Sequence, residues 1–138
     1  MPLTIDVMLN HLKQHVSKIL ASAKTATLST FGPAGIQARV FPCEAQGIHL
    51  YLLLPSVSDQ LFNLERNPNA VVSTSRWQLR GSGRVLALHD SPDGLALPQS
   101  LLAEGCVLLE IRPSQLQVYR RNGWGFSETI DIEPDWQT

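Results

Sequence analysis

The residues best suited to chemistry are serines at the start of a predicted helix. Pro55 ends an apolar run, Ser56 forms a capping box with Asp59 three residues later, and Ser58 is an alternative N-cap. Hydroxyl and free N–H groups at a helix N-terminus favour anions, because the helix dipole is positive there. All three lysines lie within the first 24 residues. An anion bound further along the chain must therefore be met by arginine or backbone N–H groups.

The other reactive side chains do not combine into a recognised catalytic or metal centre. Cys43 and Cys106 lie far apart without C-x-x-C spacing, which predicts reduced, packed thiols. The chain also has no Ser-His-Asp or Cys-His arrangement and no carboxylate pair suited to acid–base chemistry. The histidines are scattered without metal-ligand spacing: His11, His15, His49 and His89. We therefore predict no metal site and no catalytic side chain.

Composition and length indicate an ordinary globular protein. The 138 residues fit one domain, which we expect to span residues 1–138. Hydrophobic residues make up 43% and charged residues 17%, and a net charge of −1 gives no reason to expect nucleic acid or membrane partners. No apolar run approaches the roughly 20 residues of a membrane span, and no basic-then-apolar leader is visible. We expect a cytoplasmic protein.

The hydrophobic pattern predicts a mainly β, α+β fold. Apolar residues recur every three or four positions between Met8 and Leu20, which is typical of an amphipathic helix. A second, shorter helix is expected to start within residues 55–60 and to stop at Asn67-Pro68-Asn69. Alternating or continuous apolar runs predict strands at residues 25–30, 36–41, 48–54, 70–75, 77–88, 107–111 and 115–120. Turn signals recur every 8–12 residues or so. The pattern favours a small antiparallel barrel with a helix at its start and one between strands.

The order of short motifs in this chain is also informative. A small-residue strand (26–30), a glycine turn (32–35), a strand carrying Arg39, a Ser-started helix (58–60) and an Asn-Leu-x-x-x-Pro segment (63–68) follow one another. In this order they resemble the FMN-binding split barrel of the pyridoxamine 5′-phosphate oxidase superfamily. Residues 77–85 resemble the strand of that family that crosses the dimer interface, and 123–131 resemble endings of some members. The similarity covers roughly residues 15–131.

The resemblance implies an antiparallel split β-barrel that forms a homodimer, with FMN bound at the interface by both subunits. Carried over by position, Arg39 faces the phosphate or ribityl chain of FMN. Val40 and Phe41 run beside the isoalloxazine ring. Ser56 and Ser58 meet the phosphate at the helix N-terminus.

Four further residues belong to the site that the resemblance implies. Gln60 occupies a phosphate-side position that is commonly basic in the family, Trp77 and Trp124 approach the ring from the partner subunit, and Arg84 is a further candidate. Each has a plainer interpretation as well. The tryptophans can be core or interface anchors, Arg39 a solvated charge or ion-pair member, and the serines helix caps.

Three positions depart from the basic pattern of the family. Asp59 and Gln60 stand where arginine and lysine are common, and Glu44 stands where the oxidases proper carry a basic residue. A carboxylate beside a phosphate costs on the order of 1–4 kcal/mol per close pair near a surface. Three functions therefore stay open: an FMN-dependent oxidoreductase, a binder of another cofactor such as deazaflavin or haem, and a cofactor-free dimeric interaction protein.

Overall fold

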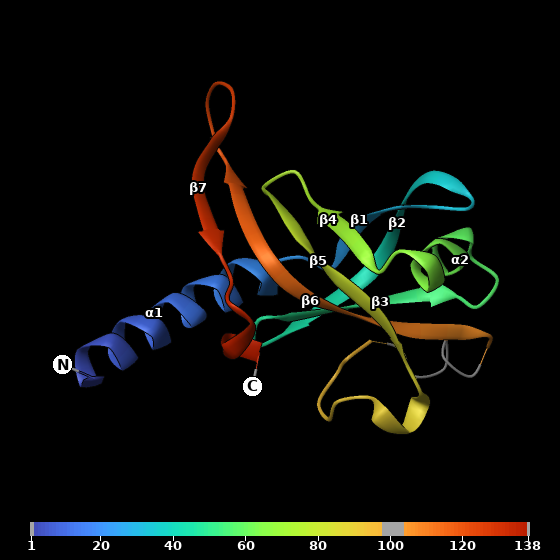
Figure 1. Cartoon of the computed structure of the whole chain (residues 1–138), viewed down its shortest axis with the longest axis horizontal. Helices are drawn as coiled ribbons and strands as arrows, with labels where there is room; N and C mark the ends of the chain where they lie inside the picture. The colour runs from blue at the N-terminus through green and yellow to red at the C-terminus, as the bar shows by residue number, and fades with distance from the viewer. Residues whose placement is uncertain (1, 98–103, 138) are drawn as a thin grey trace.

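The computed structural model describes residues 2–97 and 104–137. In chain order the elements are α1 (Pro2–Ala21), β1 (Thr25–Gly32), β2 (Gly35–Gln46), β3 (His49–Pro55), α2 (Asp59–Arg66), β4 (Asn69–Ser73), β5 (Trp77–Leu86), the 3-10 helix η1 (Leu88–Asp90), β6 (Cys106–Tyr119), β7 (Phe126–Asp131) and the 3-10 helix η2 (Pro134–Gln137). Figure 1 shows α1 leading away from the strands, with α2 on the opposite side of the molecule. Among the described residues, no helix is long and apolar enough to cross a membrane.

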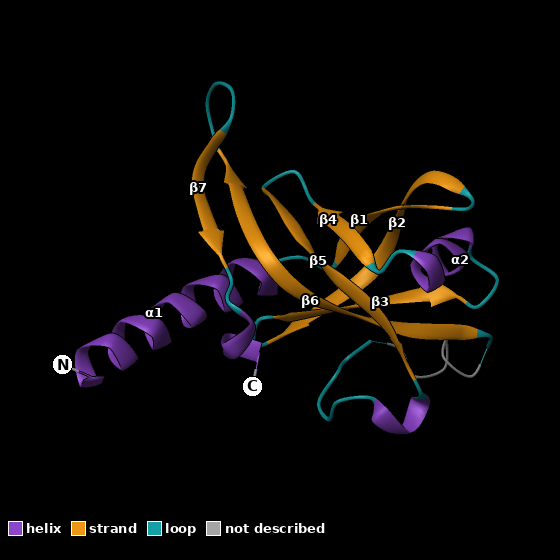
Figure 2. Cartoon of the chain, viewed as in Figure 1, coloured by secondary structure: helices purple, strands orange, loops and turns teal. Residues whose placement is uncertain are grey.

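The strands form one antiparallel sheet in the order β3-β2-β1-β4-β5-β6-β7. An additional pairing between β3 and β6 closes six of these strands into a barrel, and β7 extends the sheet beyond β6 (Figure 2). The predicted mainly β split barrel, with a helix at its start and one between strands, is confirmed.

Alternation along the strands fills the barrel with apolar side chains. In β1, Ala26 and Leu28 are buried, while Thr27 and Ser29 next to them are less buried. The strand β3 is buried on both sides, as its continuous apolar run predicts, since Leu52 packs in the main core and Leu53 in a second cluster. That second cluster includes Leu97, so the segment after η1 covers the outer face of β3.

The main correction concerns β6. We expected two strands separated by Pro113, but one strand runs from Cys106 to Tyr119. The strand continues because Pro113 faces Gly81 at the point where the β5–β6 register shifts, and a bulge tolerates a residue without an N–H group. A Cβ on Gly81 would lie 2.3 Å from the carbonyl oxygen of Arg112. The backbone of β6 therefore approaches β5 closely at this glycine.

Other strand boundaries also moved. β2 does not end near residue 41 but continues to Gln46, so a single long strand pairs with β1 and then with β3. β4 and β5 each end two residues earlier than expected, at Ser73 and Leu86. The sequence also predicts a short, partly helical connection at residues 95–104, and most of it lies outside the described residues.

Candidate functional site

The barrel opens where β2 and β3 separate. β3 pairs with β2 only over the stretch that begins at Cys43, and residues 35–42 of β2 pair with β1 alone. The Cys43 N–H donates to the Lys24 carbonyl, so the backbone groups of Arg39, four residues earlier, also face β1. Those of Ala38 and Val40 face the other way. No described strand pairs with them, which leaves donors and acceptors along this edge of β2.

The helix α2 packs at this opening and is fixed by buried amides. Gln60 is fully buried: its Oε1 accepts from the Thr30 hydroxyl at 2.6 Å and its Nε2 donates to the Leu28 carbonyl at 2.8 Å. Asn63, also fully buried, donates to the Gly35 carbonyl at 2.9 Å and to the Thr30 hydroxyl at 3.1 Å. Both amide side chains are thus used inside the chain. Gln60 is placed as an anchor of the helix, with its side chain turned into the barrel.

The N-terminus of α2 is capped by Ser58. Its hydroxyl oxygen accepts from the Gln60 N–H at 3.2 Å, so the second of the two predicted caps is the one observed. Ser56 is exposed, and its N–H donates to the Gly105 carbonyl at 2.8 Å. Asp59, the first residue of the helix, is exposed and puts a negative charge at this end.

Arg39 and this helix end share Leu28 as a neighbour. Arg39 stands directly across from Leu28 in the β1–β2 register, and the Leu28 carbonyl is the acceptor for Gln60 in the first turn of α2. Neighbouring residues across an antiparallel pair lie about 5 Å apart, so Arg39 and the first turn of α2 flank the same residue. Arg39 is exposed, and within residues 2–97 and 104–137 it forms no ion pair.

The residues that follow Arg39 face opposite sides of β2. Val40 is 64% exposed on the outer face, whereas Phe41 is buried in the main core. Of these two residues, only Val40 is therefore placed to touch a ligand at the surface of this protomer.

The remaining predicted residues are spread over the fold. Trp77 is 1% exposed and belongs to the main core. Arg84 lies on the outer face of β5, where its Nη2 is 3.2 Å from a Glu110 carboxylate oxygen. Trp124 is 97% exposed in the connection between β6 and β7, which projects from the barrel in Figure 1. One protomer thus places Ser56 and Ser58 at the start of α2 and Arg39 and Val40 on β2, while the tryptophans and Arg84 lie elsewhere in the fold.

Glu44 and Asn63 make structural hydrogen bonds that were not predicted from the sequence. Both oxygens of the Glu44 carboxylate accept from the Ala96 N–H, at 2.7 and 2.9 Å, so this residue holds the segment after η1. Asn63 also accepts from the Ala34 N–H at 2.8 Å and so fixes the β1–β2 turn to α2. The Asn-Leu-x-x-x-Pro motif contained Asn63, but nothing in its spacing indicated a buried amide.

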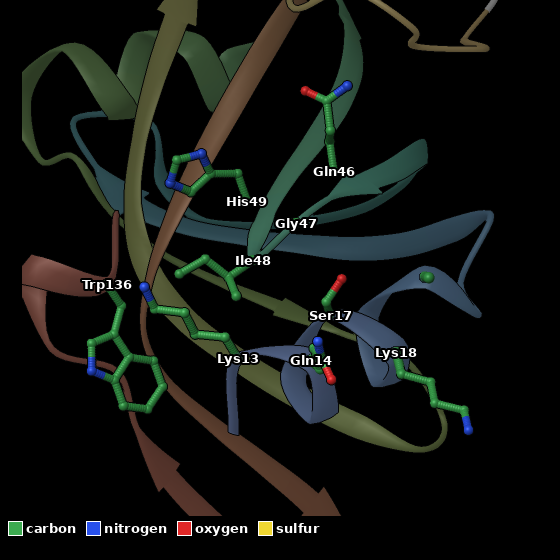
Figure 3. A pocket seen from close by; sticks show the side chains of 10 residues that line it. Lys13, Gln14, Ser17, Lys18, Gln46, Gly47, Ile48, His49 and Trp136 are labelled. Atoms are coloured by element: carbon green, nitrogen blue, oxygen red, sulfur yellow. The ribbon is translucent and has the colours of Figure 1, made fainter. Parts of the chain in front are cut away.

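A separate pocket lies between α1 and the turn that joins β2 to β3 (Figure 3). It has a volume of about 530 Å³, and Lys13, Lys18, His49 and Trp136 are among its lining residues. None of the predicted cofactor-binding residues lines it. Among the described residues, no group of three or more His, Cys, Asp or Glu side chains is arranged to hold a metal ion.

Solved structures with a similar fold identify the architecture. General stress protein 26 from Bacillus anthracis str. Sterne matches with a TM-score of 0.65 and 18% identity over 88% of this chain and 99% of that chain. A Clostridium acetobutylicum protein related to general stress protein 26 of B. subtilis, of the pyridoxinephosphate oxidase family, matches with a TM-score of 0.63 and 14% identity over 91% and 96%. This chain has the pyridoxamine 5′-phosphate oxidase-like split-barrel fold.

One similar solved structure is described by the ligand that it binds. A heme binding protein from Mycobacterium smegmatis matches with a TM-score of 0.61 and 17% identity over 84% of this chain and 56% of that chain. No protein-family model and no curated protein matches the sequence. At these identities the comparison gives the fold, and the function must be argued from the site.

Proposed function

We propose that this chain is an FMN-binding, oxidoreductase-like split-barrel protein that works as a homodimer. The observation that carries the proposal is the position of Arg39. It is exposed, it stands across from Leu28, to which the first turn of α2 is hydrogen-bonded, and it lies on the stretch of β2 whose outer edge is unpaired. A cation, a helix N-terminus and free backbone groups in one place are the components of a phosphate site next to a planar ring.

These residues fit a flavin in the following way. Arg39, the Ser56 hydroxyl and the N–H groups at the start of α2 would hold the phosphate. The unpaired backbone groups of Ala38 and Val40 would hydrogen-bond the polar edge of the ring. Bound flavin would supply hydride or electron transfer. The protein then needs no acid–base side chain at the site, in keeping with the sequence.

The acidic residues near the site have unequal effects on a phosphate. Glu44 is tied by both oxygens to the Ala96 N–H, so part of its charge is compensated within the chain. Asp59 is exposed at the helix end itself and opposes an anion there. We therefore expect FMN to bind more weakly than at a site with a basic pair.

Self-association is supported by exposed apolar side chains on the outer face of the barrel. Phe31 and Ile36 lie directly opposite each other on β1 and β2, with exposed fractions of 61% and 78%, and Val40 lies on the same face. Apolar side chains gathered on one face are typical of an interface. Trp124, exposed on a projecting connection, is then available to reach a site on a partner.

Haem is the second candidate, because a structurally similar protein is a heme binding protein. Haem iron needs only one or two axial ligands, and none of the residues at positions 38–40, 56 and 58 is a histidine, cysteine, methionine or tyrosine, which favours the flavin. A visible spectrum separates the two, since haem gives a strong Soret band and flavin does not. A cofactor-free dimer would show neither.

The decisive experiment is an FMN titration of the purified chain, followed by flavin fluorescence, with light scattering to measure the oligomeric state. Saturable binding is expected, and Arg39→Ala should weaken it about tenfold or more, which is roughly 1.4 kcal/mol. Arg66→Ala, at the far end of α2, is the matched control and should leave affinity unchanged. No saturation below about 100 μM FMN would refute the function, and equal losses in both variants would refute the site.

A further inference from the structure

Two arginines on the outer face of β5 and β6 are held by one buried carboxylate. The Glu110 side chain is only 8% exposed, and its Oε1 is 3.2 Å from both the Arg84 Nη2 and the Arg112 Nε. The Tyr51 hydroxyl donates to the other carboxylate oxygen at 3.2 Å. Glu110 therefore has every partner that a buried carboxylate needs, and it fixes two guanidinium groups next to each other.

The cluster keeps an excess of positive charge at the surface. Two guanidinium charges meet one carboxylate, which leaves a formal net charge of +1. The Arg84 and Arg112 side chains are 62% and 50% exposed. Each guanidinium has five N–H donors, and the described contacts with Glu110 use one on each arginine. The remaining donors can reach a ligand at the surface.

A polar pocket adjoins Arg112, one of these two arginines. It has a volume of about 600 Å³ and is lined by Asn69, Ser82, Arg112 and Ser114 among others. Ser82 stands directly across from Arg112 in the β5–β6 register, and strand alternation puts Ser82 and Arg84 on one face of β5. Ser82 and Asn69 therefore line the same pocket as Arg112. Carboxylates are absent from the described lining of this pocket.

We propose that Arg84, Arg112 and Ser82 form a binding site for the phosphate group of a small ligand, separate from the flavin site. Guanidinium groups bind phosphate oxygens in pairs of parallel hydrogen bonds, and Glu110 holds the two groups in place before the ligand arrives. A phosphate offers three oxygens to the two guanidiniums and the hydroxyl. A carboxylate has only two, which a single guanidinium satisfies.

The proposal is tested with the whole chain and inorganic phosphate, by calorimetry and by the NMR signals of the arginine Nε–H groups. We expect the Arg84 and Arg112 signals to shift on titration. Arg112→Gln should weaken binding about tenfold or more. Arg80→Gln is the matched control, since Arg80 is also exposed on β5 and forms no ion pair among the described residues. It should change affinity less than about twofold.

A second variant covers the case in which Arg112→Gln leaves Glu110 short of a partner and unfolds the chain. Ser82→Ala removes only the hydroxyl, leaves the Glu110 contacts intact, and should weaken phosphate binding about threefold or more. If the Arg84 and Arg112 Nε–H signals do not shift at about 20 mM phosphate, the proposed site is wrong. The same holds if Arg80→Gln and Arg112→Gln lose phosphate affinity equally. The two arginines would then only neutralise the charge of Glu110. Acetate binding as tight as phosphate would overturn the choice of phosphate. FMN affinity measured on the same variants keeps this test separate from the flavin proposal.

Discussion

Gln60 provides a direct test of whether α2 is anchored by its amide or uses that amide to hold a ligand. The side chain is fully buried and makes hydrogen bonds of 2.6 Å with Thr30 and 2.8 Å with Leu28. Gln60→Leu keeps nearly the same volume but removes both bonds. The Leu28 carbonyl loses a buried donor, and the Thr30 hydroxyl loses its acceptor while still accepting from Asn63.

The expected cost follows from these contacts. A hydrogen bond contributes about 1 kcal/mol net, and a buried polar group left without a partner costs about 1–3 kcal/mol. Two lost bonds, with one of the two partners still bonded to another side chain, give a loss of about 2–4 kcal/mol in the free energy of unfolding. Urea denaturation followed by tryptophan fluorescence measures it. Glu65→Gln, an exposed change on the same helix, should stay within about 0.5 kcal/mol of the parent.

One result would refute this reasoning. If Gln60→Leu unfolds within about 1 kcal/mol of the parent but binds FMN much more weakly, the amide acts on the ligand and does not anchor the helix. If stability falls as expected and FMN affinity falls with it, the loss of affinity follows from a displaced helix end.

Other predictions concern the strands and the thiols. Gly81→Ala should lower the free energy of unfolding by about 1–3 kcal/mol, because its Cβ would lie 2.3 Å from the Arg112 carbonyl oxygen; thermal or urea unfolding measures this. Burial raises the pKa of the Cys43 thiol to about 11, so a thiol reagent at pH 8 should label the partly exposed Cys106 first. Because the pKa of Cys43 is higher in the folded chain than in the unfolded chain, folding favours the protonated thiol. The free energy of unfolding should therefore fall as the pH rises from 9 to about 11, and Cys43→Ala should abolish this part of the pH dependence. Burial, together with Glu110, raises the pKa of Tyr51 to about 12, which ultraviolet titration of the phenol should show.

The fold was predictable because its signals are local. Alternation marked β1, a continuous apolar run marked β3, and Asn67 before Pro68 marked the end of α2. The continuity of β6 was not predictable in the same way. Pro113 is a strand breaker by itself, and only its pairing with Gly81 across the sheet shows that a bulge accommodates it.

The site was only partly predictable, because side-chain direction depends on the partner strand. The serine cap and the exposed arginine follow from turn and strand patterns. Gln60 lies in the first turn of the predicted helix. Nothing in the local sequence indicates that its side chain turns into the barrel and bonds to Leu28, 32 residues earlier. Likewise, the bond between Glu44 and Ala96 spans 52 residues and has no local signal.

Replacing Asp59 gives the sharpest test of where a phosphate binds, because the proposed site predicts that the replacement will raise the affinity for FMN. Asp59 is the exposed first residue of α2, so a phosphate at that helix end meets its charge. Removing the charge of Asp59 should weaken its repulsion of the FMN phosphate by about 1 kcal/mol, which is about fivefold in affinity. Asp59→Asn should therefore tighten FMN binding about fivefold, and Asp59→Lys should do so by about 25-fold. Both variants lose a favourable helix-dipole interaction of about 0.3–1 kcal/mol, so a more stable fold does not account for tighter binding.

Riboflavin, which lacks the phosphate, is the matched ligand for this test and should bind the parent and both variants equally. Glu65→Lys adds the same charge change near the opposite end of the helix and should leave FMN affinity within about twofold. Equal FMN affinity in the parent, Asp59→Asn and Asp59→Lys would place the phosphate away from α2, and the role proposed for Arg39 would fall with it. A gain with FMN but none with riboflavin would show that the departure from the basic pattern at this position sets the affinity of the site.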